Sequence, residues 1–193
     1  EDRPPAEASP AEPTSHDWGP PAASLRSLAA FLGGIKPSLP PGAPTETGLY
    51  GIFSDTQINL LIANVTVTGA FEGIYFSNVS SSIIVQDSAG ANGRNGITLD
   101  NGSWANGISN NVFNSNMNDG ISLSNSSSNT LFGNTTHSNA DDGINLFDSS
   151  SNNTLSSNSI YASGDDGIAL LSSGNNTISG NTVTLSGSIS IFL

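Results

Sequence analysis

From residue 51 onward, the chain repeats a short alternation of apolar and polar residues at a nearly constant interval. Segments of the type Gly-Ile-x-Leu, one of them with Phe in the last position, begin at Gly73, Gly96, Gly120, Gly143 and Gly167. These glycines are 23, 24, 23 and 24 residues apart, and Gly51-Ile52 and Ser188-Ile189 extend the series at each end. Such an interval indicates a repeat architecture, and short alternating segments indicate strands. The pattern predicts a coil of strands with one turn per repeat.

Three further columns of residues keep the same phase. One column consists of Asn59, Ser82, Asn106, Asn129, Asn153 and Asn176. A second consists of Asn64, Asp87, Asn111, Asn134, Asn158 and Asn181. An apolar column beside the first consists of Leu60, Ile83, Ile108, Leu131, Leu155 and Ile178. Stacked turns align identical side chains, so we expect the apolar column to fill the interior and the asparagines to lie at bends.

The first part of the chain has a different composition. All ten prolines lie between Pro4 and Pro44, and no asparagine precedes Asn59. We therefore expect a Pro/Ala-rich arm at residues 1–47 and a repeat domain at residues 48–193. Within the arm, residues 22–34 place Leu25, Leu28 and Leu32 at helical spacing, which predicts a short amphipathic helix. A helix this short is marginal by itself, so we expect it to cap one end of the domain.

Composition excludes several classes of function. The 193 residues contain 4 Lys+Arg against 16 Asp+Glu, which gives a net charge of −12 and argues against nucleic acid and anionic lipid as partners. The chain has no cysteine, and His16, His137 and Met117 leave little material for imidazole or copper chemistry. No apolar run is long enough to span a membrane as a helix. The first residue is Glu1, which fits removal of a secretion signal and equally fits a cloned segment, and we expect a secreted or cell-surface protein.

The repeat resembles a known family. Units such as residues 142–146 (Asp-Gly-Ile-Asn-Leu), followed by Asn153-Thr154-Leu155 and Asn158, resemble the right-handed parallel β-helix repeat proteins. Among these are carbohydrate-binding and sugar-hydrolase β-helices and NosD-type repeats of secreted surface proteins. The resemblance covers residues 51–193 and implies an all-β, right-handed parallel β-helix of about six turns of 22–24 residues. It leaves function open, because the same repeat supports lyases, hydrolases, epimerases, adhesins and inert spacers.

A column of carboxylates precedes the glycine corners. Its candidate metal ligands are Asp119, Asp141, Asp142, Asp165 and Asp166. Like charges on adjacent turns raise one another's pKa or require a cation, and oxygen ligands without His or Cys suit calcium. The alternative is that these residues are solvated, because Asp is favoured in turns. We expect no required cofactor, with calcium as the candidate metal.

One sequence motif suggests catalysis, but other motifs that accompany it in known enzymes are absent. Asp165-Asp166-Gly167 resembles the acidic pair of pectin-hydrolysing β-helices, and paired carboxylates can cleave glycosidic bonds. Those families also carry a Gly-His-Gly and an Arg-x-Lys element, and this sequence has neither. The domain contains ten acids and one base, Arg94, so a polyanionic substrate would be repelled. The tryptophans and tyrosines share no common period, so we expect them to pack rather than to bind sugar. The sequence therefore predicts a protein without enzymatic activity.

The sequence also contains seven Asn-x-Ser/Thr glycosylation motifs. Two of them, at Asn64 and Asn134, fall in the second asparagine column and are expected to point inward, where no glycan fits. The candidate glycosylation sites are Asn78, Asn101, Asn125, Asn152 and Asn175. The first three are in phase with one another and predict an outward-facing row.

The ends of the coil suggest a role in assembly. The candidate interface residues are Leu25, Leu28 and Leu32 near one end and Ile189, Ile191, Phe192 and Leu193 at the other. An uncovered solenoid end exposes unpaired backbone groups that another subunit can pair with. A head-to-tail contact that does not close into a ring gives a filament. We therefore expect an extracellular structural protein that assembles with copies of itself into a fibre or surface layer. The alternatives are a carbohydrate-binding or carbohydrate-processing β-helix, with cell-surface polysaccharide as partner, and a calcium-dependent adhesin.

Overall fold

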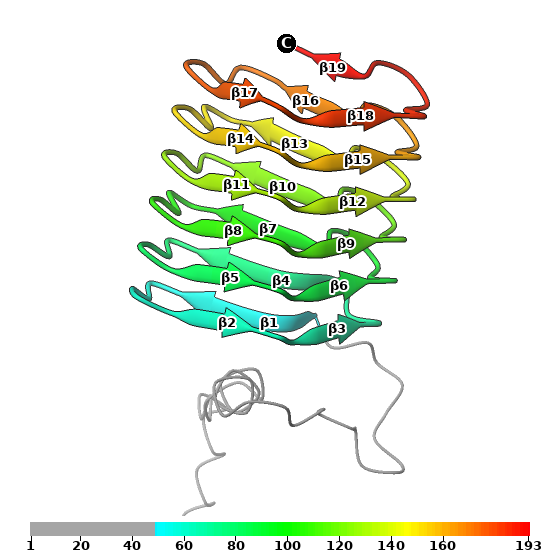
Figure 1. Ribbon diagram of the computed structural model, residues 1–193. Coiled ribbons are helices and arrows are strands. Elements are labelled where there is room, and N and C mark those ends of the chain that lie inside the picture. The colour runs from blue at the N-terminus through cyan, green and yellow to red at the C-terminus, as the bar shows by residue number, and fades with distance from the viewer. Residues whose placement is uncertain (1–48) are drawn as a thin grey trace, which may run out of the picture.

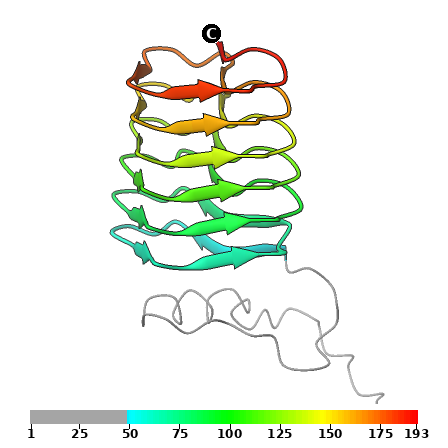
Figure 2. The ribbon, with the colours of Figure 1, turned by 45° about the vertical axis from the view of Figure 1, so that its right-hand side comes forward.

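A computed structural model describes residues 49–193 of the chain, and they form a parallel β-helix (Figure 1). The strands wind upward in regular turns, each contributing one strand to each of three sheets, as the second view also shows (Figure 2). The predicted all-β parallel β-helix of about six turns is confirmed. The predicted arm at residues 1–47 and the helix at residues 22–34 lie outside the described residues.

Three parallel sheets form the sides of the coil. Sheet 1 contains β1 (Tyr50–Asp55), β4 (Glu72–Ser77), β7 (Ile97–Asp100), β10 (Ile121–Ser124), β13 (Ile144–Phe147), β16 (Ile168–Leu170) and β19 (Ile191–Phe192). Sheet 2 contains β2 (Leu61–Ala63), β5 (Ile83–Val85), β8 (Gly107–Ser109), β11 (Thr130–Phe132), β14 (Thr154–Ser156) and β17 (Thr177–Ser179). Sheet 3 contains β3 (Thr66–Thr68), β6 (Ser88–Gly90), β9 (Val112–Asn114), β12 (Thr135–His137), β15 (Ser159–Tyr161) and β18 (Thr182–Thr184). Among these residues there is no helix, and so none that could cross a membrane.

The Gly-Ile-x-Leu segments are the strands of sheet 1, and they stack in register. Ile121 pairs with Ile97 on one side and with Ile144 on the other, and all three are fully buried. The glycine before each isoleucine is required because the backbone of the next turn passes too close to leave room for a side chain. A Cβ built at Gly120 would lie 2.7 Å from the carbonyl oxygen of Gly143 on the next turn. The recurring glycine therefore lets the corner pass close to its neighbour.

The predicted apolar column of sheet 2 was wrong in its first two turns. The buried column consists of Ile62, Ile84, Ile108, Leu131 and Leu155, with the partly buried Ile178 at its end. Ile83 pairs with Gly107 and is 51% exposed, because it lies one residue out of phase with the interior position. Since side chains alternate between the two faces of a strand, a shift of one residue turns the side chain outward.

Asparagine side chains form hydrogen-bonded ladders at the corners. From the third turn onward, two of these ladders are the asparagine columns predicted from the sequence. Buried Asn134 donates from Nδ2 to the carbonyl oxygen of Ile108 at 2.8 Å, and its Oδ1 accepts the backbone N–H of Asn111 at 3.1 Å. A third ladder, missed in the sequence, contains Asn92, Asn116 and Asn139. Each of these amides bonds backbone groups of a neighbouring turn, so the asparagine corners can be buried with their backbone groups paired.

Candidate functional site

The residue before each corner glycine of sheet 1 lies at the start of a strand, and the register stacks these residues into one column. We call it the acidic column, and it consists of Glu72, Asn95, Asp119, Asp142 and Asp166. Its backbone pairing continues from turn to turn, because the Gly120 N–H donates to the carbonyl of Asp142 at 3.0 Å and the Gly143 N–H to the carbonyl of Asp166 at 3.0 Å. The repeat therefore brings together carboxylates that are more than 20 residues apart in the sequence.

Three carboxylates of the column accept backbone N–H groups of the next turn, whereas the ladder asparagines bond the backbone of the preceding turn. Oδ1 of Asp119 accepts the N–H of Asp142 at 3.2 Å, and its Oδ2 accepts Nδ2 of Asn145 at 3.4 Å. Oδ1 of Asp142 accepts the N–H of Asp166 at 2.9 Å, and Oδ1 of Asp166 accepts the N–H of Ile189 at 2.8 Å. Part of the predicted metal set is therefore engaged in holding the coil together.

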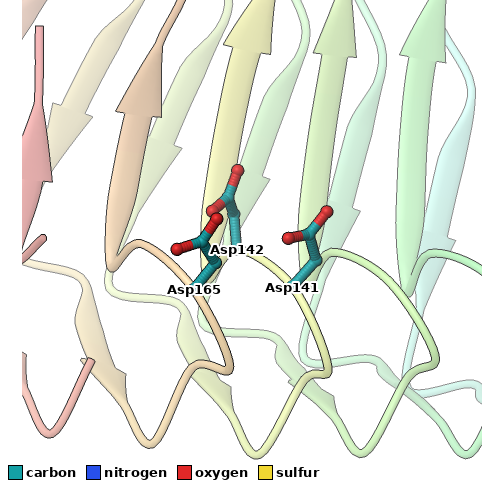
Figure 3. A group of neighbouring side chains, drawn as sticks. All are labelled: Asp141, Asp142 and Asp165. Atoms are coloured by element: carbon teal, nitrogen blue, oxygen red, sulfur yellow. The ribbon is translucent and has the colours of Figure 1, made fainter. Parts of the chain in front are cut away.

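Three of the five predicted ligands do come together. Asp141, Asp142 and Asp165 each place a carboxylate oxygen within 4.8 Å of the other two (Figure 3). Asp142 is buried, Asp141 is half-buried and Asp165 is exposed, so the group opens to solvent on one side. Asp119 and Asp166 are not part of this group. We call these three residues the aspartate cluster.

Burial changes the protonation of this region. Burial raises the pKa of Asp142 to about 7. The backbone hydrogen bond from Asp166 opposes this rise, and repulsion from Asp119, Asp141 and Asp166 adds to it. Burial likewise raises the pKa of Asp119 to about 6. The pKa of Asp141 is also raised, first by burial and then by repulsion from Asp165 and Asp166. Near neutral pH, Asp142 therefore exchanges between its acid and its carboxylate form.

Aromatic rings gather at the other end of the same face. Tyr50, Phe53 and Tyr75 lie with ring centroids 4.9 to 6.0 Å apart. The Tyr75 hydroxyl donates to Oδ2 of Asp100 at 2.7 Å. From the sequence, the tyrosines were expected to pack separately and not to form a common sugar-binding surface. The missed signal is that Phe53 and Tyr75 both occupy the x position of Gly-Ile-x-Leu, the outward position of sheet 1.

The single cation of the described chain is already paired. Nη1 of Arg94 donates to Oε1 of Glu72 at 2.9 Å, and Oε2 of Glu72 accepts the Thr98 hydroxyl at 2.8 Å. Burial raises the pKa of Glu72, and the bonds to Thr98 and Arg94 oppose that rise. Glu72 lies on the acidic column three turns before Asp142, and Arg94 lies two turns before it.

The other predicted residues fall on different surfaces. The candidate glycosylation sites are all exposed and have positive φ angles of 46° to 58°: Asn78, Asn101, Asn125, Asn152 and Asn175. Asn134 is buried as expected, but Asn64 is exposed, because Val65 rather than Asn64 aligns with Asp87. The candidate interface residues at and beside the last strand, β19, are 39% to 80% exposed: Ile189, Ile191, Phe192 and Leu193. Leu25, Leu28 and Leu32 lie outside the described residues.

Comparison with known proteins identifies the family. A family model described as "Periplasmic copper-binding protein (NosD)" matches residues 42–193. The chain belongs to this NosD family. No curated protein sequence matched it.

Solved structures similar to this NosD family member are enzymes that process alginate. A crystal structure of a mutant of the periplasmic alginate epimerase AlgG matches with 25% identity and a TM-score of 0.62 over 74% of this chain and 42% of that one. An alginate lyase from Paenibacillus sp. str. FPU-7 matches with 16% identity and a TM-score of 0.64 over 69% of this chain and 53% of that one. The chain thus spans less than half the length of the epimerase.

The prediction of a non-enzymatic protein is wrong on this comparison, because the similar structure at 25% identity is described as an alginate epimerase. That prediction relied on the missing His, Arg and Lys elements of pectin-hydrolysing β-helices. Those elements belong to one arrangement of catalytic groups, and the aspartate cluster is formed by other residues on adjacent turns.

The family description implies copper, and the donor set of residues 49–193 does not fit it. Copper is bound in proteins mainly through Cys, Met and His ligands. This part of the chain contains one His, one Met and no Cys. His137 stacks on Tyr161 with ring centroids 4.8 Å apart, and Met117 is 74% exposed. We therefore assign no copper chemistry to the described β-helix.

Proposed function

We propose that this β-helix processes a polysaccharide that lies along the outer face of sheet 1, with Asp142 as the group that transfers a proton. The observation that carries the proposal is the aspartate cluster, in which a buried carboxyl with a pKa near 7 lies beside two less buried carboxylates. A proton donor or acceptor is most effective when its pKa lies near the working pH. The similarity to alginate-processing enzymes supports a carbohydrate substrate.

The residues favour hydrolysis among the reactions of such enzymes. Protonated Asp142 would donate its proton to the glycosidic oxygen while the exposed Asp165 carboxylate attacks the sugar carbon that the oxygen leaves. Retaining glycosidases place two carboxyl groups about 5 Å apart, and the oxygens of the cluster lie within 4.8 Å of one another. Water would then cleave the glycosyl–Asp165 bond, with Asp142 accepting the water proton.

Proton abstraction beside a uronic acid carboxylate fits less well. That reaction requires a cation to neutralise the substrate carboxylate. Within residues 49–193, the only Lys or Arg side chain is Arg94, which lies two turns from Asp142 and is already paired with Glu72. The acidic face also repels polyanions. A neutral polysaccharide is therefore the favoured substrate class.

The aromatic group supports an extended substrate. Tyr75 lies on β4 and the cluster lies at the start of β13, which is three strand spacings away in sheet 1. At ~4.8 Å per spacing, the two features are about 14 Å apart along the axis. Aromatic rings bind the apolar faces of sugars by stacking. A glycan chain along the axis would contact the rings and the cluster at once.

The location that fits this function is outside the cytoplasm. The family and the epimerase are both described as periplasmic. We propose that this chain acts in the periplasm or at the cell surface, on glycan available there. Self-assembly, glycosylation and calcium binding remain predictions, and calcium would compete with the proton for Asp142.

The test is polysaccharide turnover by matched variants. We would incubate the purified chain with a panel of neutral and uronate polysaccharides and measure the release of reducing ends. We expect a neutral polysaccharide to be cleaved and Asp142→Asn to lower the rate by about 100-fold or more. The control is Asp148→Asn, an exposed aspartate of the same domain, which should leave the rate unchanged. Full activity of Asp142→Asn, or no turnover of any member of the panel, would contradict the proposal.

A further inference from the structure

A group of exposed apolar side chains lies at the beginning of the coil, on the first strands of sheet 2 and on the bridged residues that precede them. Ile58, Leu61, Ile83 and Trp104 are 65%, 51%, 51% and 53% exposed, and we call them the apolar patch. Backbone pairing makes them neighbours, since Leu61 pairs with Ile83, and Ile58 and Trp104 both pair with Ser80. No strand of sheet 2 contains a charged residue, although the domain carries ten acids. An uncharged apolar surface on so acidic a protein indicates a contact.

The apolar character is confined to the first turns. The positions that continue the column of Leu61 and Ile83 are Gly107, Thr130, Thr154 and Thr177. Gly107 leaves open space beside Ile83, since no atom lies within 4 Å of the place where its Cβ would be. Phe132 is a further exposed apolar residue, in the neighbouring column. The surface therefore changes from apolar to hydroxyl-bearing with distance from residue 49.

The charge pattern of the chain indicates what covers this patch. Residues 18–45 contain no Asp or Glu, and they carry Arg26 and Lys36. They are thus the basic stretch of a chain with a net charge of −12. The same stretch places Leu25, Leu28 and Leu32 at helical spacing. It combines an apolar face with a charge opposite to that of the β-helix.

The connection is long enough for this contact. The described chain begins at Leu49, in the first turn, which also carries Ile58 and Leu61. The 15 residues from Gly34 to Leu49 can span about 50 Å when extended. The three turns of the patch extend over only about 10 Å of the axis.

We infer that residues 22–34 of the same chain dock on the apolar patch of sheet 2, through Leu25, Leu28 and Leu32. This contact lies on the side of the coil, whereas the cap predicted from the sequence lies over an end. It covers Trp104 and the space beside Gly107, and it leaves the outer face of sheet 1 open. The inference is independent of the proposed function, because the two faces share no residue.

Engineered cysteines test the contact in the full chain, which has no cysteine of its own. We would combine Leu28→Cys with Ile83→Cys on the patch, and Leu28→Cys with Thr177→Cys as the matched pair at the far end of the same sheet. Under dilute oxidising conditions we expect the first pair to form the intramolecular disulfide at least about fivefold more efficiently, because docking raises the effective concentration. Equal efficiency, or a disulfide found only between two chains, would overturn the inference and in the second case assign the patch to a second copy.

Tryptophan quenching gives a second readout that leaves sheet 2 unchanged. In a Trp18→Phe background, Trp104 is the single tryptophan. We expect Leu28→Asp to raise quenching of its fluorescence by acrylamide about twofold or more, whereas Ser27→Asp, off the apolar stripe, has no effect. If Trp104 is quenched equally in all three proteins, the segment does not cover it and the inference fails. Protection of Trp104 only upon addition of polysaccharide would also overturn it and assign the patch to sugar.

Discussion

The carboxyl group of Asp87 accepts the backbone N–H of Val65 through Oδ1 at 2.7 Å, while its Oδ2 is buried and has no hydrogen-bond partner. One turn later, Asn111 occupies the same place, and its Nδ2 donates to the carbonyl oxygen of Ile84 at 3.0 Å. The ladder therefore places a donor where Asp87 has its second oxygen. A carboxyl group supplies that donor only when it is protonated. Burial raises the pKa of Asp87 to about 6.

We expect Asp87→Asn to stabilise the fold at neutral pH. The folded pKa of about 6 lies above the ordinary value of 3.8, so the stability associated with protonated Asp87 is complete below pH 4 and is lost as pH rises through 6. At pH 7.5, the variant should gain about 1–3 kcal/mol in the free energy of unfolding. At pH 4, the gain should be close to zero.

Urea unfolding of both proteins at pH 4 and pH 7.5 measures this difference. Asp55→Asn is the matched control, because Asp55 is exposed. A gain that is equal at the two pH values would show that the proton on Asp87 is not the cause.

Loss of one ladder amide should be costly. Asn134→Ala removes the acceptor for the buried N–H of Asn111 and the donor to the carbonyl of Ile108. Two buried backbone groups then lack partners, so we expect the free energy of unfolding to fall by about 2–5 kcal/mol. The control Asn125→Gly changes an exposed asparagine whose positive φ suits glycine, and it should cost less than about 1 kcal/mol. Similar urea midpoints for the two variants would rule out the ladder as a main source of stability.

Calcium should bind the aspartate cluster in competition with protons. Addition of millimolar calcium at pH 8 should raise the melting temperature, and the rise should be smaller at pH 5.5, where Asp142 is protonated. Asp165→Asn should reduce the rise, whereas Asp148→Asn should not. Calorimetry with and without chelator measures the effect. If the melting temperature does not respond at pH 8, the aspartate cluster does not bind calcium and its residues serve only as corner residues.

The aromatic group should contribute to substrate affinity rather than to the chemical step. Tyr75→Ala removes a ring about 14 Å from the cluster along the axis. We expect KM to rise by about threefold to tenfold while kcat changes little, because stacking on one ring is worth about 1 kcal/mol. Steady-state kinetics on the cleaved polysaccharide measure both constants. A threefold to tenfold fall in kcat with unchanged KM would contradict this prediction and assign Tyr75 a role in the chemical step.

The fold could be predicted from the sequence because its repeat is explicit. The Gly-Ile pairs fix one strand per turn, and the asparagine columns fix two corners. The register of the first turns could not be fixed in the same way, because Leu60, Leu61, Ile83 and Ile84 are all apolar and only the pairing of Ile83 with Gly107 decides which side chains point inward.

The site was predictable in part. The acidic column follows from the position before each glycine, but the sequence could not separate aspartates that hold the coil from those that remain free. Both carboxylate oxygens of Asp119 accept hydrogen bonds, from Asp142 and Asn145. The carboxylates of Asp141 and Asp165 instead lie close to that of Asp142. The aromatic group was missed because the tryptophans and tyrosines alone share no period, and the shared outward position emerges only when Phe53 is compared with Tyr75.

The pH dependence of polysaccharide cleavage tests the central claim most directly. If Asp142 donates the proton, kcat should fall tenfold per pH unit as the pH rises above about 7. In Asp142→Asn, the residual rate should lose this dependence, while Asp148→Asn keeps the wild-type profile. A wild-type rate that does not change between pH 6 and pH 9, or an Asp142→Asn profile identical to the wild type, would contradict the assignment of proton transfer to Asp142.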